Sequence, residues 1–237
     1  MRLDNYLYIH GFTDSRNRAK ELILNKKVSV NSSIITKASF KVDNNSTVDI
    51  KILQENIYVG RGAEKLKLFL LSNRVDIRNR RCLDVGSSTG GFVQILLENE
   101  AADVTAVDVG RGQLHTLLKQ DKRVISHEST DIREFIAQEP FDLVTCDVSF
   151  VGIENIMKDL DRLSRKDIII LFKPQFEVGK EVKRNKKGVI KDQKAIESAI
   201  IKFQALAYEY GWRMIAKEYC KIKGKEGNAE IFYHFQK

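Results

Sequence analysis

The first hydrophobic pattern in the chain is that of two short helices. Leu3 and Leu7 stand one helical turn apart, and Gly11 follows where a helix can end. Asp14 or Ser15 can cap a second helix. The apolar stripe of that helix, at positions i, i+3 and i+4, consists of Ala19, Leu22 and Ile23. Alternating apolar positions then predict strands at residues 28–30 and 47–52. Residues 1–57 are therefore interpreted as a small α/β unit.

From residue 58 onward, apolar runs alternate with helical patterns. We predict strands at residues 82–85, 104–109, 124–126, 142–146, 167–172, 213–219 and 230–235. We predict helices at residues 90–98, 131–138 and 192–210. This alternation indicates a mostly parallel sheet covered on both faces. The last two strands lack a helix between them, which predicts an antiparallel edge. The domain boundary is placed between residues 57 and 58, at this change of pattern.

Charge favours a polyanionic partner. The 237 residues include 40 Lys or Arg and 32 Asp or Glu, which gives a formal net charge of +8. Basic surfaces attract nucleic acid or anionic membrane, although mild basicity is also common among cytoplasmic proteins. The longest apolar runs, such as residues 168–172, are far too short to span a bilayer, so no membrane partner is expected. The N-terminus also lacks the apolar core of a signal peptide.

Cysteine and histidine usage argues against a disulfide framework and a zinc site. Cys82, Cys146 and Cys220 are widely spaced and form no CxxC pair. The four histidines never occur as HExxH. We therefore expect no metal and a reducing, cytoplasmic location.

A glycine-rich loop follows the first strand of the second unit. The segment LDVGSSTGGF spans residues 83–92 and leads into a predicted helix. Its spacing is neither the dinucleotide fingerprint GxGxxG nor the phosphate-binding loop, because Phe92 stands where that loop requires lysine. Ligands of such sheets bind at the carboxyl ends of the strands, where Asp108 can accept hydrogen bonds from ribose hydroxyls. A purely structural turn is the alternative.

A glycine loop and an acidic strand end without phosphate chemistry favour S-adenosylmethionine (SAM) as the cofactor. Asp84 can meet the amino group of its methionine part. Asp131 is a candidate for the adenine edge or, alternatively, a helix N-cap. The predicted cofactor-binding residues are Asp84, Gly86, Ser87, Gly90, Gly91, Phe92, Asp108 and Asp131.

Four polar residues are candidates for the chemistry. Asp147 and Lys173 close the fourth and fifth predicted strands, so both are expected at the cofactor end of the sheet. Lys65 lies on a helix that enters the unit, and Glu230 begins the last predicted strand. Taken singly, each could be a surface ion pair.

The N-terminal unit contains the segments RLDNYL, SRNRAKELI and KKVSVN, followed by the KAS of residues 37–39. On these segments it resembles the RNA-binding module first seen in ribosomal protein S4. The resemblance implies that basic side chains contact RNA phosphates, whereas an ordinary solvated helix face is the alternative. A further basic segment spans residues 179–188. The predicted RNA-binding residues are Arg2, Arg16, Arg18, Lys20, Lys26, Lys27, Lys183 and Arg184.

The motifs YVGRGAEKL, DVGSSTGGF, CDVSF, FKPQFE and GNAEIF occur in order over residues 58–237. With them the second unit resembles the TlyA (hemolysin A) family, whose catalytic domain resembles the FtsJ/RrmJ ribose 2′-O-methyltransferases. The resemblance implies a Rossmann-like class I SAM-dependent methyltransferase with a seven-stranded sheet. It also implies methylation of a cytidine ribose in ribosomal RNA. The family's catalytic tetrad falls on Lys65, Asp147, Lys173 and Glu230.

From this resemblance we assign roles within the tetrad. Lys173 would orient and deprotonate the 2′-hydroxyl, and Asp147 would position Lys173. Lys65 would hold the developing oxyanion, and Glu230 would orient Lys65 or the ribose. Phe150 and Phe176 are candidates for stacking on a flipped base, with core packing as the alternative.

The short termini favour the large (50S) subunit and its 23S rRNA over the small (16S) one, and no oligomer is required. Two other functions stay open: a ribosome assembly factor without enzymatic activity, and a membrane-active hemolysin.

Overall fold

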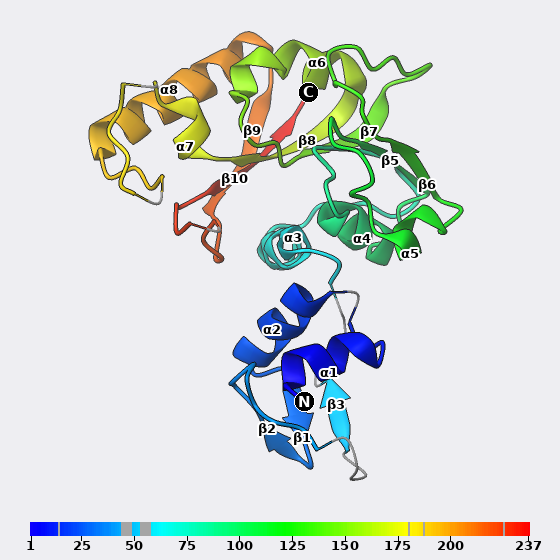
Figure 1. Ribbon diagram of the computed structural model, residues 1–237. Coiled ribbons are helices and arrows are strands. Elements are labelled where there is room, and N and C mark those ends of the chain that lie inside the picture. The colour runs from blue at the N-terminus through cyan, green and yellow to red at the C-terminus, as the bar shows by residue number, and fades with distance from the viewer. Residues whose placement is uncertain (14, 44–48, 53–57, 180, 187, 225) are drawn as a thin grey trace. The chain divides into compact units, whose positions relative to one another are not determined.

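The computed structural model describes residues 1–13, 15–43, 49–52, 58–179, 181–186, 188–224 and 226–237 (Figure 1). The chain divides into two compact units, Met1–Ile57 and Tyr58–Lys237. Each unit has its own hydrophobic core.

The first unit packs two helices on a small antiparallel sheet. Its described elements are α1 (Leu3–Ile9), α2 (Arg16–Leu24), β1 (Val28–Val30), β2 (Ser33–Ile34) and β3 (Ile50–Ile52). The strand order is β2-β1-β3. The hydroxyl of Ser15 caps α2 by accepting from the Arg18 amide. The other predicted cap, Asp14, and the start of the predicted strand at residues 47–48 lie outside the described residues.

The second unit is built on a seven-stranded sheet in the order β6-β5-β4-β7-β8-β10-β9. Its strands are β4 (Arg81–Val85), β5 (Asp103–Val107), β6 (Val124–His127), β7 (Phe141–Cys146), β8 (Ser164–Phe172), β9 (Arg213–Tyr219) and β10 (Ile231–Gln236). The first five strands in this order are parallel, and β10 pairs antiparallel with both β8 and β9. The predicted mostly parallel sheet with one antiparallel edge is confirmed.

Helices cover both faces of this sheet (Figure 1). One face carries α3 (Arg61–Ser72), α4 (Gly91–Glu98) and α5 (Thr116–Lys119). The other carries the 3-10 helix η1 (Ile153–Asn155), α6 (Met157–Leu163), α7 (Pro174–Glu177) and α8 (Gln193–Glu209). The central strands are therefore buried on both sides, which explains their nearly continuous apolar sequences.

The predicted helix at residues 131–138 is wrong. These residues form turns, and Ile132 and Phe135 pack into the core. The guanidinium of Arg162 donates to the carbonyls of Ile132 (3.0 Å) and Phe135 (2.8 Å). A helix would use those carbonyls for its own backbone hydrogen bonds, so this long-range contact replaces them. Asp131 is consequently not a helix N-cap.

The second predicted strand also ends earlier than expected. The strand β5 stops at Val107, so Asp108 is the first residue beyond it. The carboxylate of Asp108 accepts from the Gly110 amide at 2.7 Å, which turns the chain away from the sheet.

Candidate active site

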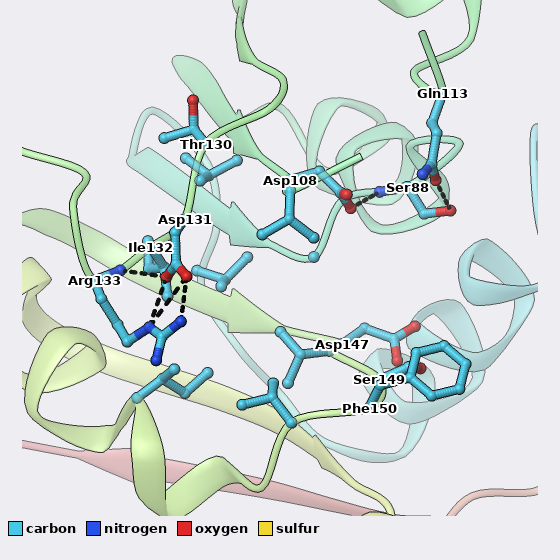
Figure 2. Close-up of a pocket in the computed structure, with 17 residues that line it drawn as sticks. Ser88, Asp108, Gln113, Thr130, Asp131, Ile132, Arg133, Asp147, Ser149 and Phe150 are labelled. Carbon is cyan, nitrogen blue, oxygen red and sulfur yellow. Dashed lines mark hydrogen bonds and ion pairs between the residues drawn. The ribbon is translucent and has the colours of Figure 1, made fainter. Parts of the chain in front are cut away.

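The carboxyl ends of β4, β5 and β7 surround a cavity of about 440 Å³ (Figure 2). Gly86 lines it directly after β4, with a φ of +79° that favours glycine. A Cβ at Gly86 would lie only 3.0 Å from the Asp147 carbonyl, so the loop approaches the next strand end closely. The volume lies within the range of small-molecule sites. Its polar lining includes Ser88, Asp108, Gln113, Thr130, Asp131, Arg133, Asp147 and Ser149.

Asp108 stands between the glycine loop and the segment after β5. Its Oδ2 accepts from the Ser88 amide at 2.7 Å, and its Oδ1 accepts from the Gly110 amide at 2.7 Å. An ionised carboxylate has about four acceptor positions. Two of them are therefore used by these amides, and the remaining capacity fits the two hydroxyls of a ribose. This donor and acceptor match is the feature of the cavity that fits a nucleoside cofactor.

Asp84 lies on β4 beneath the glycine loop and outside the cavity lining. Its Oδ1 accepts from the Thr145 hydroxyl at 2.6 Å. Its Oδ2 is buried and has no hydrogen-bond partner among the described residues. Burial raises the pKa of Asp84 to about 7, although the Thr145 hydrogen bond opposes this. Asp84 is therefore a buried acceptor with unused capacity, next to the loop that lines the cavity.

Asp84 predicts a pH dependence of stability. A carboxyl has a pKa of about 3.9 when unfolded, so the raised folded pKa means that the folded state binds the proton more tightly. Stability should therefore fall as the pH rises from about 4 to about 7, by on the order of 2–4 kcal/mol. Asp84→Asn should remove this loss. The check is urea unfolding at pH 5 and pH 8, with the exposed Asp76→Asn as control; an equal pH dependence in all three proteins would contradict it.

Four other predicted cofactor residues do not line the cavity but shape the loop around it. Ser87 is buried, and Gly90 is the left-handed N-cap of α4 with a φ of +93°. Gly91 begins α4, and a Cβ there would lie 2.6 Å from the Ala63 amide nitrogen. Phe92 is a core residue whose ring stacks on that of Phe232.

Asp131, the candidate for the adenine edge, lies on the cavity wall, where it already has a strong partner (Figure 2). The Arg133 guanidinium binds both of its carboxylate oxygens, and the Arg133 backbone amide donates to Oδ1 at 2.9 Å. The Arg133 hydrogen bonds lower the pKa of Asp131. The carboxylate is thus held as an anion in a fixed orientation at the far end of the cavity from Asp147.

At the other end of the cavity, Lys173 forms an ion pair with Asp147. Lys173 follows β8, and Asp147 follows β7, the neighbouring parallel strand. Lys173 Nζ lies 2.6 Å from Asp147 Oδ1 and donates to the Ser149 hydroxyl at 2.9 Å. An ammonium has three donors. One is donated to Ser149, whereas the contact with Asp147 is an ion pair in which Asp147 Oδ1 accepts no hydrogen bond from the described residues. Donor capacity therefore remains for a substrate oxygen.

The other two predicted tetrad residues form a second buried pair. Lys65 Nζ, on α3, lies 2.6 Å from Glu230 Oε2, and their side chains are 9% and 5% exposed. Gly62 lies one helical turn before Lys65, and a Cβ there would be 3.5 Å from Asp147 Oδ2. The two ion pairs therefore converge on one place beside the cavity.

Glycines allow α3 to approach this place. Gly62 and Ala63, in the first turn of α3, lie against Gly91, in the first turn of α4. Side chains at Gly62 or Gly91 would separate the two helices, because the contacts there are already at van der Waals distance or closer. The glycines of GRGAEKL and STGGF thus set the position of Lys65.

Sequence reasoning did not identify Ser149 or Asn228. Ser149 lies within the quoted motif CDVSF, and its spacing of two residues from Asp147 was the available signal. The buried Asn228, within GNAEIF, accepts from the Ile190 amide at 3.2 Å and donates to the Gly188 carbonyl at 3.4 Å. It therefore ties the end of the basic segment to the loop that precedes Glu230.

The predicted RNA-binding residues of the first unit differ in their exposure and in whether they already form ion pairs. Arg2 and Arg16 both bind Asp4, which is fully buried, and each guanidinium stays about half exposed. The Arg2 hydrogen bond lowers the pKa of Asp4, against the effect of burial. Arg18 pairs with Glu21 at 2.9 Å. Lys20 is half-buried, whereas Lys26 and Lys27 are exposed in the turn after α2.

The basic segment after α7 is held by hydrogen bonds from Arg184 to backbone carbonyls. The Arg184 guanidinium donates to the Val182 carbonyl at 2.8 Å and more weakly to those of Gly179 and Gln175. Lys183 is exposed beside it. Arg184 therefore shapes the segment, and Lys183 presents charge to solvent.

Each of the two units matches the model of a known protein family. The FtsJ-like methyltransferase family model matches residues 58–237, and the S4 domain model matches residues 1–48. The chain is 48% identical to the 23S rRNA (cytidine-2′-O)-methyltransferase TlyA of Campylobacter jejuni, over 94% of each chain.

Two more similarities extend over the whole chain. The 16S/23S rRNA (cytidine-2′-O)-methyltransferase TlyA of Mycobacterium tuberculosis is 35% identical over 98% of this chain and 88% of the relative. A solved structure from Streptococcus thermophilus that carries the name hemolysin has a TM-score of 0.75 and 30% identity, covering 100% of this chain and 88% of that chain. No helix within the described residues combines the length and apolar character needed to cross a membrane. The chain belongs to the TlyA (hemolysin A) family and joins an S4 domain to an FtsJ-like methyltransferase domain.

Proposed function

We propose that this protein transfers the methyl group of SAM to the 2′-oxygen of a cytidine ribose in ribosomal RNA. The observation that carries the proposal is the convergence of two ion pairs, Lys173–Asp147 and Lys65–Glu230, beside a nucleoside-sized cavity that Asp147 lines. The names of the Campylobacter and Mycobacterium relatives support the same reaction. SAM supplies an electrophilic methyl group with a good leaving group, so alignment and proton removal are the tasks left to the protein.

Lys173 is proposed to orient the ribose 2′-hydroxyl and to remove its proton. In its amine form it accepts the hydroxyl proton, and Asp147 at 2.6 Å then neutralises the resulting ammonium. Ser149 fixes the direction of the Lys173 side chain through its 2.9 Å hydrogen bond. Lys65 is proposed to stabilise the negative charge that develops on the ribose oxygen, and Glu230 holds Lys65 in place.

Aromatic side chains at the mouth of the cavity support a nucleotide substrate. Phe150 lines the cavity and is 91% exposed, so core packing does not explain it (Figure 2). Its ring centroid lies 5.1 Å from that of Phe176, which follows Lys173 by three positions. The exposed Phe150 ring and the partly buried Phe176 ring, beside a catalytic lysine, suit stacking on a base taken out of its helix.

The cofactor half of the proposal predicts a role for Asp108. Asp108→Asn keeps the shape of the side chain but removes its charge and one acceptor, so SAM should bind about 10- to 100-fold more weakly. Isothermal titration calorimetry measures the effect directly, with Asp121→Asn, which lies outside the cavity lining, as control. SAM affinity within about twofold of the wild type would contradict the assignment.

The large ribosomal subunit is the favoured substrate, because the 48% identical relative is named for 23S rRNA alone. The test is transfer of label from methyl-labelled SAM to purified 50S and 30S subunits from cells that lack this activity. We expect label in the 50S subunit. Label in the 30S subunit alone would contradict the subunit assignment, and label in neither subunit would contradict the proposed function.

A further inference from the structure

Two chain segments contact each other at several points at the catalytic end of the sheet. One runs from Asp147 to Ile153 after β7, and the other from Lys173 to Glu177 after β8. Beside the ion pair they are joined by the Lys173–Ser149 hydrogen bond, and further out by the rings of Phe150 and Phe176. At the far end, the Ile153 amide donates to both carboxylate oxygens of Glu177, each at 3.1 Å.

The second segment depends on such contacts for its direction. The helix α7 is a single turn, Pro174–Glu177, which is too short to be stable alone. Glu177 is its last residue, and the next residue, Val178, is buried. The position of α7 behind Lys173 is therefore fixed by what its end contacts, and Glu177 makes a hydrogen bond there to the opposite segment.

The first segment is held in an unusual conformation. Phe150 has a φ of +69°, in the left-handed region that residues other than glycine rarely adopt. Such a conformation persists when neighbouring contacts hold it on both sides. Lys173 contacts the segment before Phe150, at Asp147 and Ser149. Glu177 contacts it three residues after Phe150, at Ile153.

We propose that Glu177 is a positioning residue for methyl transfer, which fixes the segment carrying Ser149 and Phe150 relative to Lys173 by accepting the Ile153 amide. This inference rests on the proposed function. Glu177 would act by positioning Lys173 and Phe150, and it would not contact the reacting atoms. Loss of the hydrogen bond should misalign the ribose, because small displacements of positioning groups lower kcat strongly.

The surroundings of Glu177 make this contact sensitive to pH. Burial raises its pKa to about 7; the charge of Glu154 on η1 also raises the pKa, and that of Lys202 on α8 lowers it. Glu154 and Lys202 form an ion pair with each other and line the same small cavity as Glu177. Deprotonation makes both oxygens of Glu177 acceptors and strengthens the bond to the Ile153 amide. The hydrogen bond that fixes the segment carrying Ser149 and Phe150 should therefore become stronger as the pH rises through about 7.

The experiment compares Glu177→Ala, Glu177→Gln and the matched control Glu154→Gln in the full chain. Methyl transfer to 50S subunits is measured from pH 6 to pH 8, together with SAM affinity and melting temperature. We expect Glu177→Ala to lower kcat about 10- to 100-fold with SAM affinity within about twofold. Glutamine keeps an acceptor, so Glu177→Gln should restore part of kcat, and the ratio of wild-type to Glu177→Gln kcat should rise between pH 6 and pH 8. Glu154→Gln keeps the Glu177 hydrogen bond, so its kcat at pH 8 should match the wild type, whereas its pH profile should move to lower pH because the Glu154 charge raises the Glu177 pKa.

A wild-type kcat in Glu177→Ala, or a kcat ratio that does not change with pH, would overturn the inference while leaving the proposed function intact. Amide hydrogen exchange provides a readout that needs no methyl transfer. Exchange in residues 150–153 should accelerate in Glu177→Ala and not in Glu154→Gln. Unchanged exchange there would overturn the inference even if the wild type modified neither subunit.

Discussion

Lys173→Ala is expected to abolish nearly all methyl transfer while leaving SAM binding intact. The side-chain nitrogen of Lys173 lies beside Asp147 and Ser149, and in its neutral amine form it is the proposed acceptor of the hydroxyl proton. Loss of a general base lowers rates by about 10²- to 10⁴-fold, and loss of its orienting role acts in the same direction. Single-turnover transfer from labelled SAM, with calorimetric SAM affinity beside it, measures both effects.

The matched control for this variant is Lys158→Ala, which removes an exposed lysine from α6. It should transfer methyl groups at the wild-type rate. Equal activities of Lys173→Ala and Lys158→Ala, with normal melting of both, would show that Lys173 is not part of the chemistry.

Substitutions in the Lys65–Glu230 pair are expected to affect stability and activity differently. Both side chains are nearly buried, so Lys65→Met alone leaves the Glu230 carboxylate without its partner and should cost about 3–5 kcal/mol of unfolding free energy. Replacing both residues, with Lys65→Met and Glu230→Leu, removes both charges from the interior. This double variant should recover most of the lost stability, because apolar residues of similar volume substitute well for a buried pair.

Activity should not recover with stability. If Lys65 stabilises the developing oxyanion, the double variant should remain about 10²- to 10³-fold less active than the wild type. Urea unfolding and methyl transfer, measured on the same samples, test the two parts. A stable double variant with wild-type activity would assign the pair a structural role only.

The sheet of the second unit was predictable because its strands are buried on both faces. Runs such as residues 168–172 are apolar without interruption, and the missing helix between residues 219 and 231 indicated the antiparallel edge. Such features depend on local sequence, and a single chain is enough to show them.

The failed helix at residues 131–138 shows the limit of local patterns. Ile132 and Phe135 have helical spacing, but Arg162, 27 residues beyond Phe135, takes the carbonyls that a helix would need. The position of Asp4 is a similar case, since its burial follows from Arg2 on one side and Arg16 on another helix. Contacts across long sequence separations leave no periodic signal.

In the candidate site, too, local sequence predicts some features, whereas others depend on contacts between distant residues. The strand pattern predicts Asp147 and Lys173 at the ends of two strands. These strands are neighbours in the structure, and the two residues form an ion pair. The pairing of Lys65 with Glu230 joins residues 165 positions apart, and only the resemblance to known motifs suggested it. The close approach of Gly62 to Gly91 and the contact of Glu177 with Ile153 required the three-dimensional structure.

The most direct test of the central claim is the chemical identity of the product. Unmethylated ribosomal subunits are incubated with SAM and either the wild type or Lys173→Ala, and their RNA is digested to nucleosides for mass spectrometry. The proposed function predicts 2′-O-methylcytidine in the wild-type sample and none above background with Lys173→Ala. A methyl group on a base, or on the ribose of another nucleoside, would contradict it.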